Sequence, residues 1–394
     1  MLKQMLNSAG PIGIDLCDDA VRLLQLGYVQ GALRVIASAR ISVGETSDPY
    51  DPSAPAHDQV VRAIGERVKA GGFSGRRCAI ALPESCLAVR TARLPVMPDN
   101  ELGDAVRLDA PVHLGLADVE GGAEIGWLRT GEIFQGDDHR YELMYFGAAT
   151  KRLEQLAYAY EGVGLEPVAI EPRFVTTTRA GTRYLRRAAD SGTVQLLIDV
   201  NRLHSTVIIT RGPELVFTKS FPIGTGAMAD AIGKKLGLDP ATLSDMRRQR
   251  MDARSCDVTD QRIERAMFDA VRPTLAGIAH EASLCLRHYS VTFRGVRPSR
   301  IVLAGPGAME PGLDTVVADT LGIEVYHADP FDGVRTDTVV GGGSYGPGWT
   351  SAMGVAVRDL LKRTPSRKRN RRRSRSAHRG QTPSVSPESR GEAA

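Results

Sequence analysis

Short apolar runs along the chain predict strands in two similar sets. In each set, three runs are separated by tight turns, and the first run ends in an aspartate, Asp15 or Asp199. The predicted strands are 12–15, 21–28 and 32–40 in the first set, and 194–199, 205–210 and 215–221 in the second. We interpret this repeat as a fold-level duplication, which would place the two aspartates in a cleft between two lobes.

Further patterns predict a mixed α/β protein. Apolar runs between turn residues predict strands at 78–82, 87–94, 124–129, 140–144, 144–149, 165–170, 301–304 and 324–327. Helical spacing predicts helices at 59–70, 100–109, 151–163, 172–188, 312–321 and 351–361, and a helical segment over 226–290. We expect Pro273 to bend or divide the long helix in that segment. A Gly-rich loop is expected at 341–348.

The order of these elements predicts two lobes, each with an additional part. Short strands around one helix in 84–143 indicate an inserted subdomain, which we label 1C. The expected divisions are 10–83 with 144–189 and 349–361 (1A), 84–143 (1C), 190–225 with 291–348 (2A), 226–290 (2B), and a basic tail, 362–394.

Composition is that of a soluble globular protein. Apolar residues make up 42% of the 394 residues and charged residues 24%. No apolar run approaches the roughly 18 residues of a membrane span, and the N-terminus does not read as a signal peptide. We therefore expect a cytoplasmic protein. Five cysteines without a CxxC pair argue against a disulfide framework or a thiolate zinc site.

Positive charge is concentrated in the tail. From Lys362 onward there are 11 Lys and Arg residues against Glu388 and Glu392, a charge of +9, so the body carries 4 − 9 = −5. The tail has almost no apolar residues, and we expect it to be disordered. It could bind anionic lipid or nucleic acid, or act as a phosphorylation-regulated arm or a solubilising extension.

Several segments, taken together, resemble the PilM family, the cytoplasmic actin-like assembly proteins of type IV pili. They are 12-IGIDLCDDAVRLLQL-26, 94-LPVMPDNELGDAV-106, 145-YFGAATKRLEQLAYAYEGVGLEPVAIEP-172, 215-LVFTKSFPIG-224, 271-VRPTLAGIAHEASLCLRHYS-290, 301-IVLAGPGAMEPGL-313 and 351-SAMGVAV-357. The resemblance implies a two-lobed actin-like (ribonuclease H-like) ATPase fold of the α/β class, with an FtsA-type inserted subdomain.

In that superfamily, ATP and a metal bind between the lobes, against two hairpin turns and a glycine loop. Such loops need glycine, because phosphate approaches several backbone N–H groups at once. This chain departs from the pattern at each loop. The residues at these positions are Asp15, Cys17, Asp18 and Asp19 in the first turn, Asp199, Asn201 and Arg202 in the second, and Gly305, Pro306 and Gly307 in the third.

Each loop therefore lacks a glycine that the resemblance leads us to expect, which favours a degenerate site with weak or absent ATP and Mg²⁺ binding. Two alternatives remain open for Asp18 and Asp19. They could form a solvated turn, or could hold Mg²⁺ together with Asp15 while Arg202 faces the phosphates. If Mg²⁺ binds, the resemblance points to Asp15 and Asp199 as its ligands, and in an active ATPase Glu171 could position water.

For function, the resemblance implies a scaffold at the cytoplasmic face of the inner membrane. Its expected partner is the N-terminal cytoplasmic segment of a bitopic PilN-like protein, bound by the first lobe and its insertion, and self-association is a further expectation. The alternatives are an active ATPase whose nucleotide state regulates the partner, a related type II secretion component, or a small-molecule kinase of the same fold.

Overall fold

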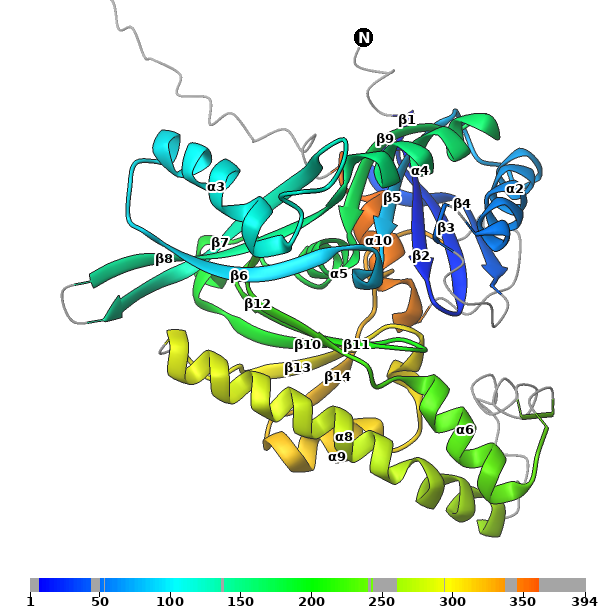
Figure 1. The fold of residues 1–394 in the computed structure, drawn as a ribbon. Coiled ribbons are helices and arrows are strands. Elements are labelled where there is room, and N and C mark those ends of the chain that lie inside the picture. The colour runs from blue at the N-terminus through cyan, green and yellow to red at the C-terminus, as the bar shows by residue number, and fades with distance from the viewer. Residues whose placement is uncertain are drawn as a thin grey trace, which may run out of the picture. The chain divides into compact units, whose positions relative to one another are not determined.

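Two sheets with the same strand order form the centres of the two lobes (Figure 1). The first contains β1 (Asn7–Ala9), β2 (Ile12–Cys17), β3 (Ala20–Val29), β4 (Ala32–Ser42), β5 (Arg77–Leu82) and β9 (Glu166–Pro172). The second contains β10 (Val194–Val200), β11 (Ser205–Arg211), β12 (Glu214–Phe221), β13 (Arg300–Ala304) and β14 (Val325–His327). In each, an antiparallel three-stranded meander is extended by two parallel strands on the side of its first strand. This agrees with the predicted duplication.

This computed structural model describes residues 7–43, 50–52, 54–135, 138–239, 242–243, 261–293, 295–336 and 346–360. Residues Met1–Lys362 form one compact unit and Arg363–Ala394 a second. The predicted disordered tail and most of the predicted Gly-rich loop lie outside the described residues. Among the helices of the described part, none combines the length and the apolar character that crossing a membrane requires.

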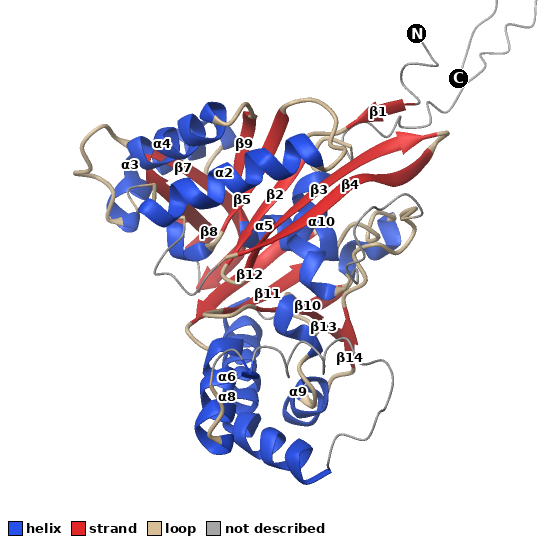
Figure 2. Ribbon diagram, turned by 90° about the vertical axis from the view of Figure 1, so that its right-hand side faces the viewer, coloured by secondary structure: helices blue, strands red, loops and turns tan. Residues whose placement is uncertain are grey.

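Helices cover both faces of the first sheet. Helices α2 (Pro55–Ala70) and α4 (Thr150–Gly162) pack on one face, where their apolar residues join the core of β2 and β5. The opposite face is covered by α10 (Thr350–Ala356), which crosses α5 (Arg173–Gly181). Helix α5 also contacts β10, β11 and β12, so α5 and α10 lie between the two sheets (Figure 2).

The outer face of the second sheet is covered by three helices, α6 (Thr225–Leu236), α8 (Gln261–Phe293) and α9 (Leu313–Leu321). Their apolar residues and the inward side chains of β10, β11 and β13 form the largest apolar cluster. Four short 3₁₀ turns complete the described secondary structure: η1 (Glu84–Cys86), η2 (Ala188–Gly192), η3 (Pro306–Met309) and η4 (Pro347–Trp349).

A third sheet belongs to the insertion in the first lobe. It has the antiparallel order β6 (Ala88–Pro95), β8 (Asp138–Ala149) and β7 (Ala123–Gln135). Helix α3 (Asp99–Leu114) packs on it through Leu102, Val106 and Ala110. The sequence predicts separate strands at 140–144 and 144–149, and assigns the second to the lobe core. Instead, β8 is one strand paired with β6 and β7 along its length, so we place the end of the insertion after Ala149.

Several predicted helices differ from those in the structure. Helix α3 continues through Pro111 to Leu114, and the predicted 172–188 helix ends at Gly181, where glycine weakens the helix. Helix α10 ends at Ala356 rather than at 361. The predicted division at Pro273 is wrong, because α8 is a single helix. Its apolar face is buried along its length, and that burial outweighs the roughly 3 kcal/mol that an internal proline costs.

Candidate functional site

Asp15 and Asp199 meet between the lobes, as the sequence predicts. Each lies near the end of the first long strand of its lobe, β2 or β10, and each is almost completely buried. A single arginine joins them. Arg173 donates from Nε to Asp15 Oδ1 at 3.0 Å and from Nη1 to Asp199 Oδ2. The gap between the two carboxylates is therefore occupied by a guanidinium group.

Sequence reasoning missed Arg173. It is the first residue of α5, directly after Pro172, at the point where β9 turns back towards the second lobe. Its side chain is 2% exposed. Burial alone would lower the pKa of Arg173, but the carboxylates of Asp15 and Asp199 raise it well above its usual value. One feature of the sequence could have indicated this role: Arg173 stands at the start of the segment that crosses between the predicted lobes.

Hydroxyl and amide groups complete the network around the two carboxylates. Ser351 donates from Oγ to Asp15 Oδ1 at 2.7 Å, and its oxygen lies 2.7 Å from the hydroxyl of Thr176. On the other side, Asn201 donates from Nδ2 to Asp199 Oδ2 at 3.3 Å. Burial raises the pKa of Asp199, which the Arg173 guanidinium opposes. Hydrogen bonds around these two carboxylates therefore connect α5, α10 and both lobes.

The two predicted phosphate turns contact one another directly. Cys17 Sγ donates to Asn201 Oδ1 at 3.2 Å. The backbone N–H of Leu203 donates to Asp18 Oδ2 at 3.1 Å, and Arg202 Nε donates to the Asp18 carbonyl at 3.3 Å. Cys17, Asp18, Asn201 and Arg202, which the sequence analysis placed at a phosphate site, are therefore hydrogen-bonded across the lobes. Burial also raises the pKa of the Cys17 thiol, which keeps it neutral.

Asp19 is not available to a metal together with Asp15 and Asp18. It accepts two bonds from Arg22, at 3.0 and 2.7 Å, and one from Arg40 at 3.1 Å. Burial would raise the pKa of Asp19, but these two arginines hold it well below the usual range. Within the described ranges, no three His, Cys, Asp or Glu residues converge so as to hold a metal ion. In this structure, the three aspartates do not form the magnesium site of that alternative.

The third predicted loop closes tightly on the same network. Gly305 has φ +81°, and a Cβ there would lie 2.5 Å from Asp199 Oδ1, so only glycine fits. Its N–H donates to the Pro347 carbonyl at 3.0 Å. Pro306 begins the 3₁₀ turn η3, and Gly307 packs against Val200. The proline that breaks the family pattern thus starts a turn held against β10.

A small pocket remains beside the bridge, with room for about one water molecule. Its lining includes Cys17, Asp18, Arg173, Asn201 and Glu84. Sequence reasoning also missed Glu84, which follows β5 and opens the connection to the insertion. Burial raises its pKa to about 7. Buried atoms without a hydrogen-bond partner surround the site, among them Glu84 Oε1, Arg173 Nη2, Asp15 Oδ2 and Asp199 Oδ1.

Glu171 is placed differently from the expectation for an ATPase. Its Oε1 accepts from Arg179 Nη2 at 2.9 Å and from Arg358 Nε at 2.9 Å, and its Oε2 accepts from Arg179 Nη1 at 2.8 Å. Both carboxylate oxygens are engaged in ion pairs among β9, α5 and the residues after α10. In this structure Glu171 therefore serves as an ion-pair partner of two arginines.

The residues between the lobes do not fit a magnesium nucleotide in this structure. Mg²⁺ takes near-octahedral oxygen ligands at about 2.0–2.1 Å, usually with several waters. Asp15 and Asp199 already share the Arg173 guanidinium, and the turns that would face phosphates are bonded to each other. A metal or a triphosphate would have to displace Arg173 and separate the turns.

Two lobes with duplicated sheets around a central cleft define this chain as a protein of the actin-like ATPase fold. The solved PilM-PilN type IV pilus biogenesis complex contains a chain with this fold, at a TM-score of 0.71 and 19% identity, covering 89% of this chain and 98% of that one. The ethanolamine utilization protein EutJ from Carboxydothermus hydrogenoformans matches at a TM-score of 0.51 and 14% identity, covering 91% and 94%.

The family model of the type IV pilus assembly protein PilM matches residues 13–359. The chain therefore belongs to the PilM family, and the resemblance inferred from its motifs is confirmed. No curated protein matches the chain.

Proposed function

We propose that this protein is a scaffold of the type IV pilus assembly machinery that works without nucleotide turnover. Membership of the PilM family supports the role in pilus assembly. The observation that carries the second part is the Arg173 bridge, because it occupies the point where Asp15 and Asp199 would hold a metal. The nucleotide loops then serve to hold the lobes together.

The proposed partner is the N-terminal cytoplasmic segment of a bitopic PilN-like protein. Its support is the PilM-PilN complex, in which a chain of the same fold is assembled with PilN. Binding such a segment would place the protein at the cytoplasmic face of the inner membrane. That location forms part of the proposal.

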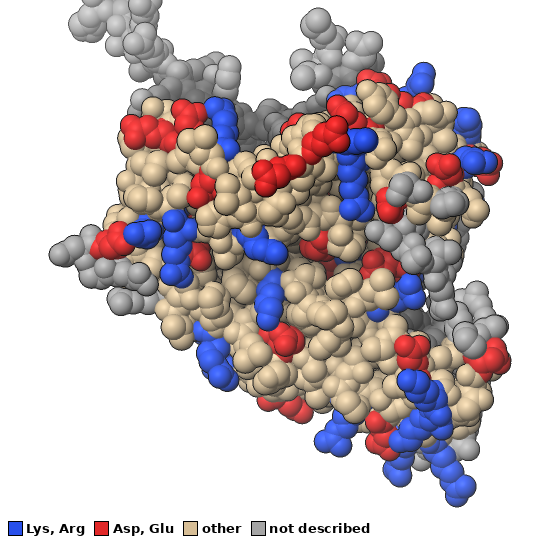
Figure 3. Space-filling view, viewed as in Figure 1, with Lys and Arg blue, Asp and Glu red and all other residues tan. Residues whose placement is uncertain are grey.

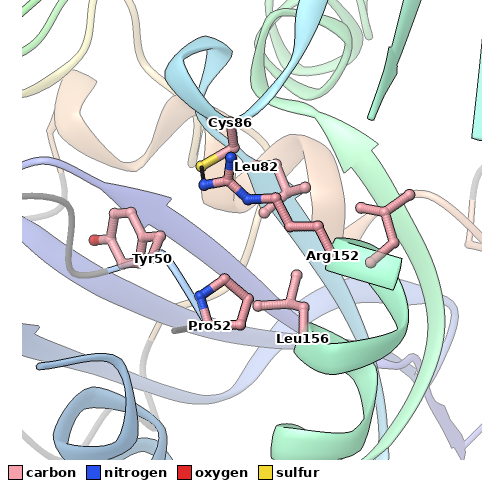
Figure 4. Close-up of a pocket in the computed structure, with 7 residues that line it drawn as sticks. Tyr50, Pro52, Leu82, Cys86, Arg152 and Leu156 are labelled. Atoms are coloured by element: carbon pink, nitrogen blue, oxygen red, sulfur yellow. Dashed lines mark hydrogen bonds between the residues drawn. The ribbon is translucent and has the colours of Figure 1, made fainter. Parts of the chain in front are cut away.

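A small apolar pocket supports a peptide contact where the insertion joins the first lobe (Figure 4). Leu82 lines it from the end of β5, Cys86 from η1, and Leu153 and Leu156 from α4. Arg152 lies at the pocket, with Nη2 3.8 Å from Cys86 Sγ. The pocket has room for about one water molecule, so a peptide would lie across its apolar rim rather than fill it, with the cation near a peptide carbonyl or carboxylate.

Binding of a synthetic PilN-like N-terminal peptide, measured by calorimetry, tests this proposal. Where a one-span PilN-like protein is encoded beside this gene, its N-terminal segment supplies the peptide. We expect Arg152→Ala to weaken binding about tenfold, since a charge-assisted contact contributes about 1.5–3 kcal/mol. Lys151→Ala, at an exposed position one residue away on α4, is the matched control. Absence of binding by the unaltered protein would contradict the partner assignment.

An active ATPase remains a second candidate, because Asp15 and Asp199 do face one another between the lobes. ATP affinity, measured with and without Mg²⁺, separates the two proposals. We expect no binding at micromolar ATP under either condition. Micromolar binding that is lost in Asp15→Ala would instead establish a nucleotide site and reject the scaffold without turnover.

A further inference from the structure

One side chain connects the central strands of the two lobes. Arg173 uses different nitrogens for Asp15 on β2 and Asp199 on β10, and all three side chains are at most 2% exposed. The other direct contacts across this gap are single hydrogen bonds between the turns, such as Cys17 to Asn201 and Leu203 to Asp18. Among the described contacts at this junction, Arg173 makes the buried ion pairs, one to Asp15 and one to Asp199, in which donor and acceptor are both charged.

The electrostatics around Arg173 resemble those of a cation site. Two buried carboxylates meet a single guanidinium, and Glu84 lines the small pocket that Arg173 also lines. Each aspartate also keeps one buried oxygen without a hydrogen-bond partner, Asp15 Oδ2 and Asp199 Oδ1. Without the guanidinium, two carboxylates would be left close together in a site of low dielectric, an arrangement that repels itself and attracts a divalent cation.

The surrounding backbone is fitted to this closed arrangement. Gly305 approaches Asp199 Oδ1 so closely that no larger residue fits, and Ser351 holds Asp15 from α10. The carboxylates are thus fixed in position from both lobes. Arg173 supplies a positive charge between them from within the chain.

We propose that Arg173 is an internal replacement for a divalent cation, holding the two lobes closed when neither metal nor nucleotide is bound. The inference goes beyond the proposed scaffold function, because it concerns lobe closure and is tested with metal alone. Failure to bind the partner peptide would leave it standing, and failure of the test below would leave the partner assignment standing.

The experiment measures thermal unfolding and amide hydrogen exchange of the full chain with and without millimolar Mg²⁺. In the unaltered protein we expect no response to Mg²⁺. In Arg173→Ala we expect the Tm to fall by about 5–15 °C, because one partner of a buried ion pair is lost. Exchange should become faster at 12–19 and 199–205. Mg²⁺ should restore both readouts, as expected of a ligand that binds the folded state.

Two further variants keep the test decisive. Asp15→Asn/Arg173→Ala/Asp199→Asn removes the repulsion along with the bridge, and we expect it to fold without responding to Mg²⁺. Arg173→Lys keeps the charge but not the two-armed geometry, so its exchange at 199–205 should be faster than in the unaltered protein. Arg211→Ala, at an exposed position on β11, is the matched control.

Three outcomes would overturn the proposal. The first is unchanged stability and exchange in Arg173→Ala. The second is loss of stability in Arg173→Ala that Mg²⁺ does not reverse. The third, which applies even if Arg173→Ala does not fold, is exchange in Arg173→Lys equal to that of the unaltered protein.

Discussion

At the residue scale, arginines neutralise the acidic groups that sequence patterns connect with phosphate or metal chemistry. Asp19 is paired with Arg22 and Arg40, and Glu171 with Arg179 and Arg358, in the same way that Arg173 joins the two aspartates between the lobes. Asp19 and Glu171 are partly buried, where a charge without a partner would be costly. Pairing with arginine makes both acids structural contacts in this structure.

Glu84 should make stability depend on pH near neutrality. Burial raises its pKa from the usual 4.5 to about 7, so the folded state holds a proton that the unfolded state releases. Glu84 therefore lowers the free energy of unfolding as the pH rises from about 4.5 to about 7. Above that range the loss is complete. Urea unfolding of Glu84→Gln should show a gain of about 1–2 kcal/mol over the unaltered protein at pH 8, and none at pH 4.

The control for removing one carboxylate is Glu154→Gln, at an exposed position on α4. A stability difference between Glu84→Gln and the unaltered protein that stays constant from acid to alkaline pH would show that Glu84 is not the responsible group.

At the element scale, the crossing of α5 and α10 depends on one glycine. A Cβ added at Gly354 would overlap the carbonyl of Thr176, whose hydroxyl contacts Ser351 of the interlobe network. Gly354→Ala should therefore force the helices apart and lower stability by about 3 kcal/mol, measured by urea unfolding. The matched change Gly103→Ala, in helix α3, meets nothing within 4 Å and should raise stability by up to about 1 kcal/mol. Equal effects at both positions would contradict the close crossing.

Restoring the family glycines should not restore nucleotide binding. The combined change Cys17→Gly, Asn201→Gly and Pro306→Gly returns each turn to the expected pattern but leaves the Arg173 bridge in place. The bond from the Leu203 N–H to Asp18 also remains. Titration with a fluorescent ATP analogue and Mg²⁺ should detect no micromolar binding. Micromolar binding would mean that the turns alone, rather than the bridge, block the site.

At the scale of the whole molecule, charge is unevenly distributed along the chain. Figure 3 shows acidic and basic side chains interspersed over one face, with basic ones gathered over the end of α6 and the start of α8. Helix α6 ends with Lys234 and Lys235. The most basic segment of the sequence is the tail, 362–394, which lies outside the described residues.

Deleting residues 363–394 should leave the fold intact while changing its charge. The deletion removes 10 Lys and Arg and 2 acidic residues, so the net charge changes from +4 to 4 − 8 = −4. We expect the same Tm within about 2 °C, and loss of salt-sensitive binding to anionic vesicles, which the basic tail would supply. A large drop in Tm would show that the tail packs on the rest of the chain. Binding to nucleic acid but not to vesicles would assign the tail to the other proposed partner class.

Much of the fold could be predicted because its signals are local. Turn residues and apolar runs locate the strands at 12–15, 78–82 and 194–199 to within a few residues, and the repeat indicated two equivalent lobes. Predictions failed where long-range packing overrides local propensity. Pro273 remains within α8 because the helix is buried along its length, and β8 continues through Met144 because it has neighbours on both sides.

The sequence by itself determined the family, the duplicated strand pattern and the two aspartates that meet between the lobes, because motif order and apolar periodicity are properties of neighbouring residues. Only the tertiary structure decided what lies between those aspartates. Arg173 is 158 positions from Asp15 and 26 from Asp199, and nothing in its local sequence specifies that its two arms reach both. The same applies to the pairing of Asp19 and Glu171, since whether an acid is a ligand or an ion-pair partner depends on which cation the fold brings within about 3–4 Å.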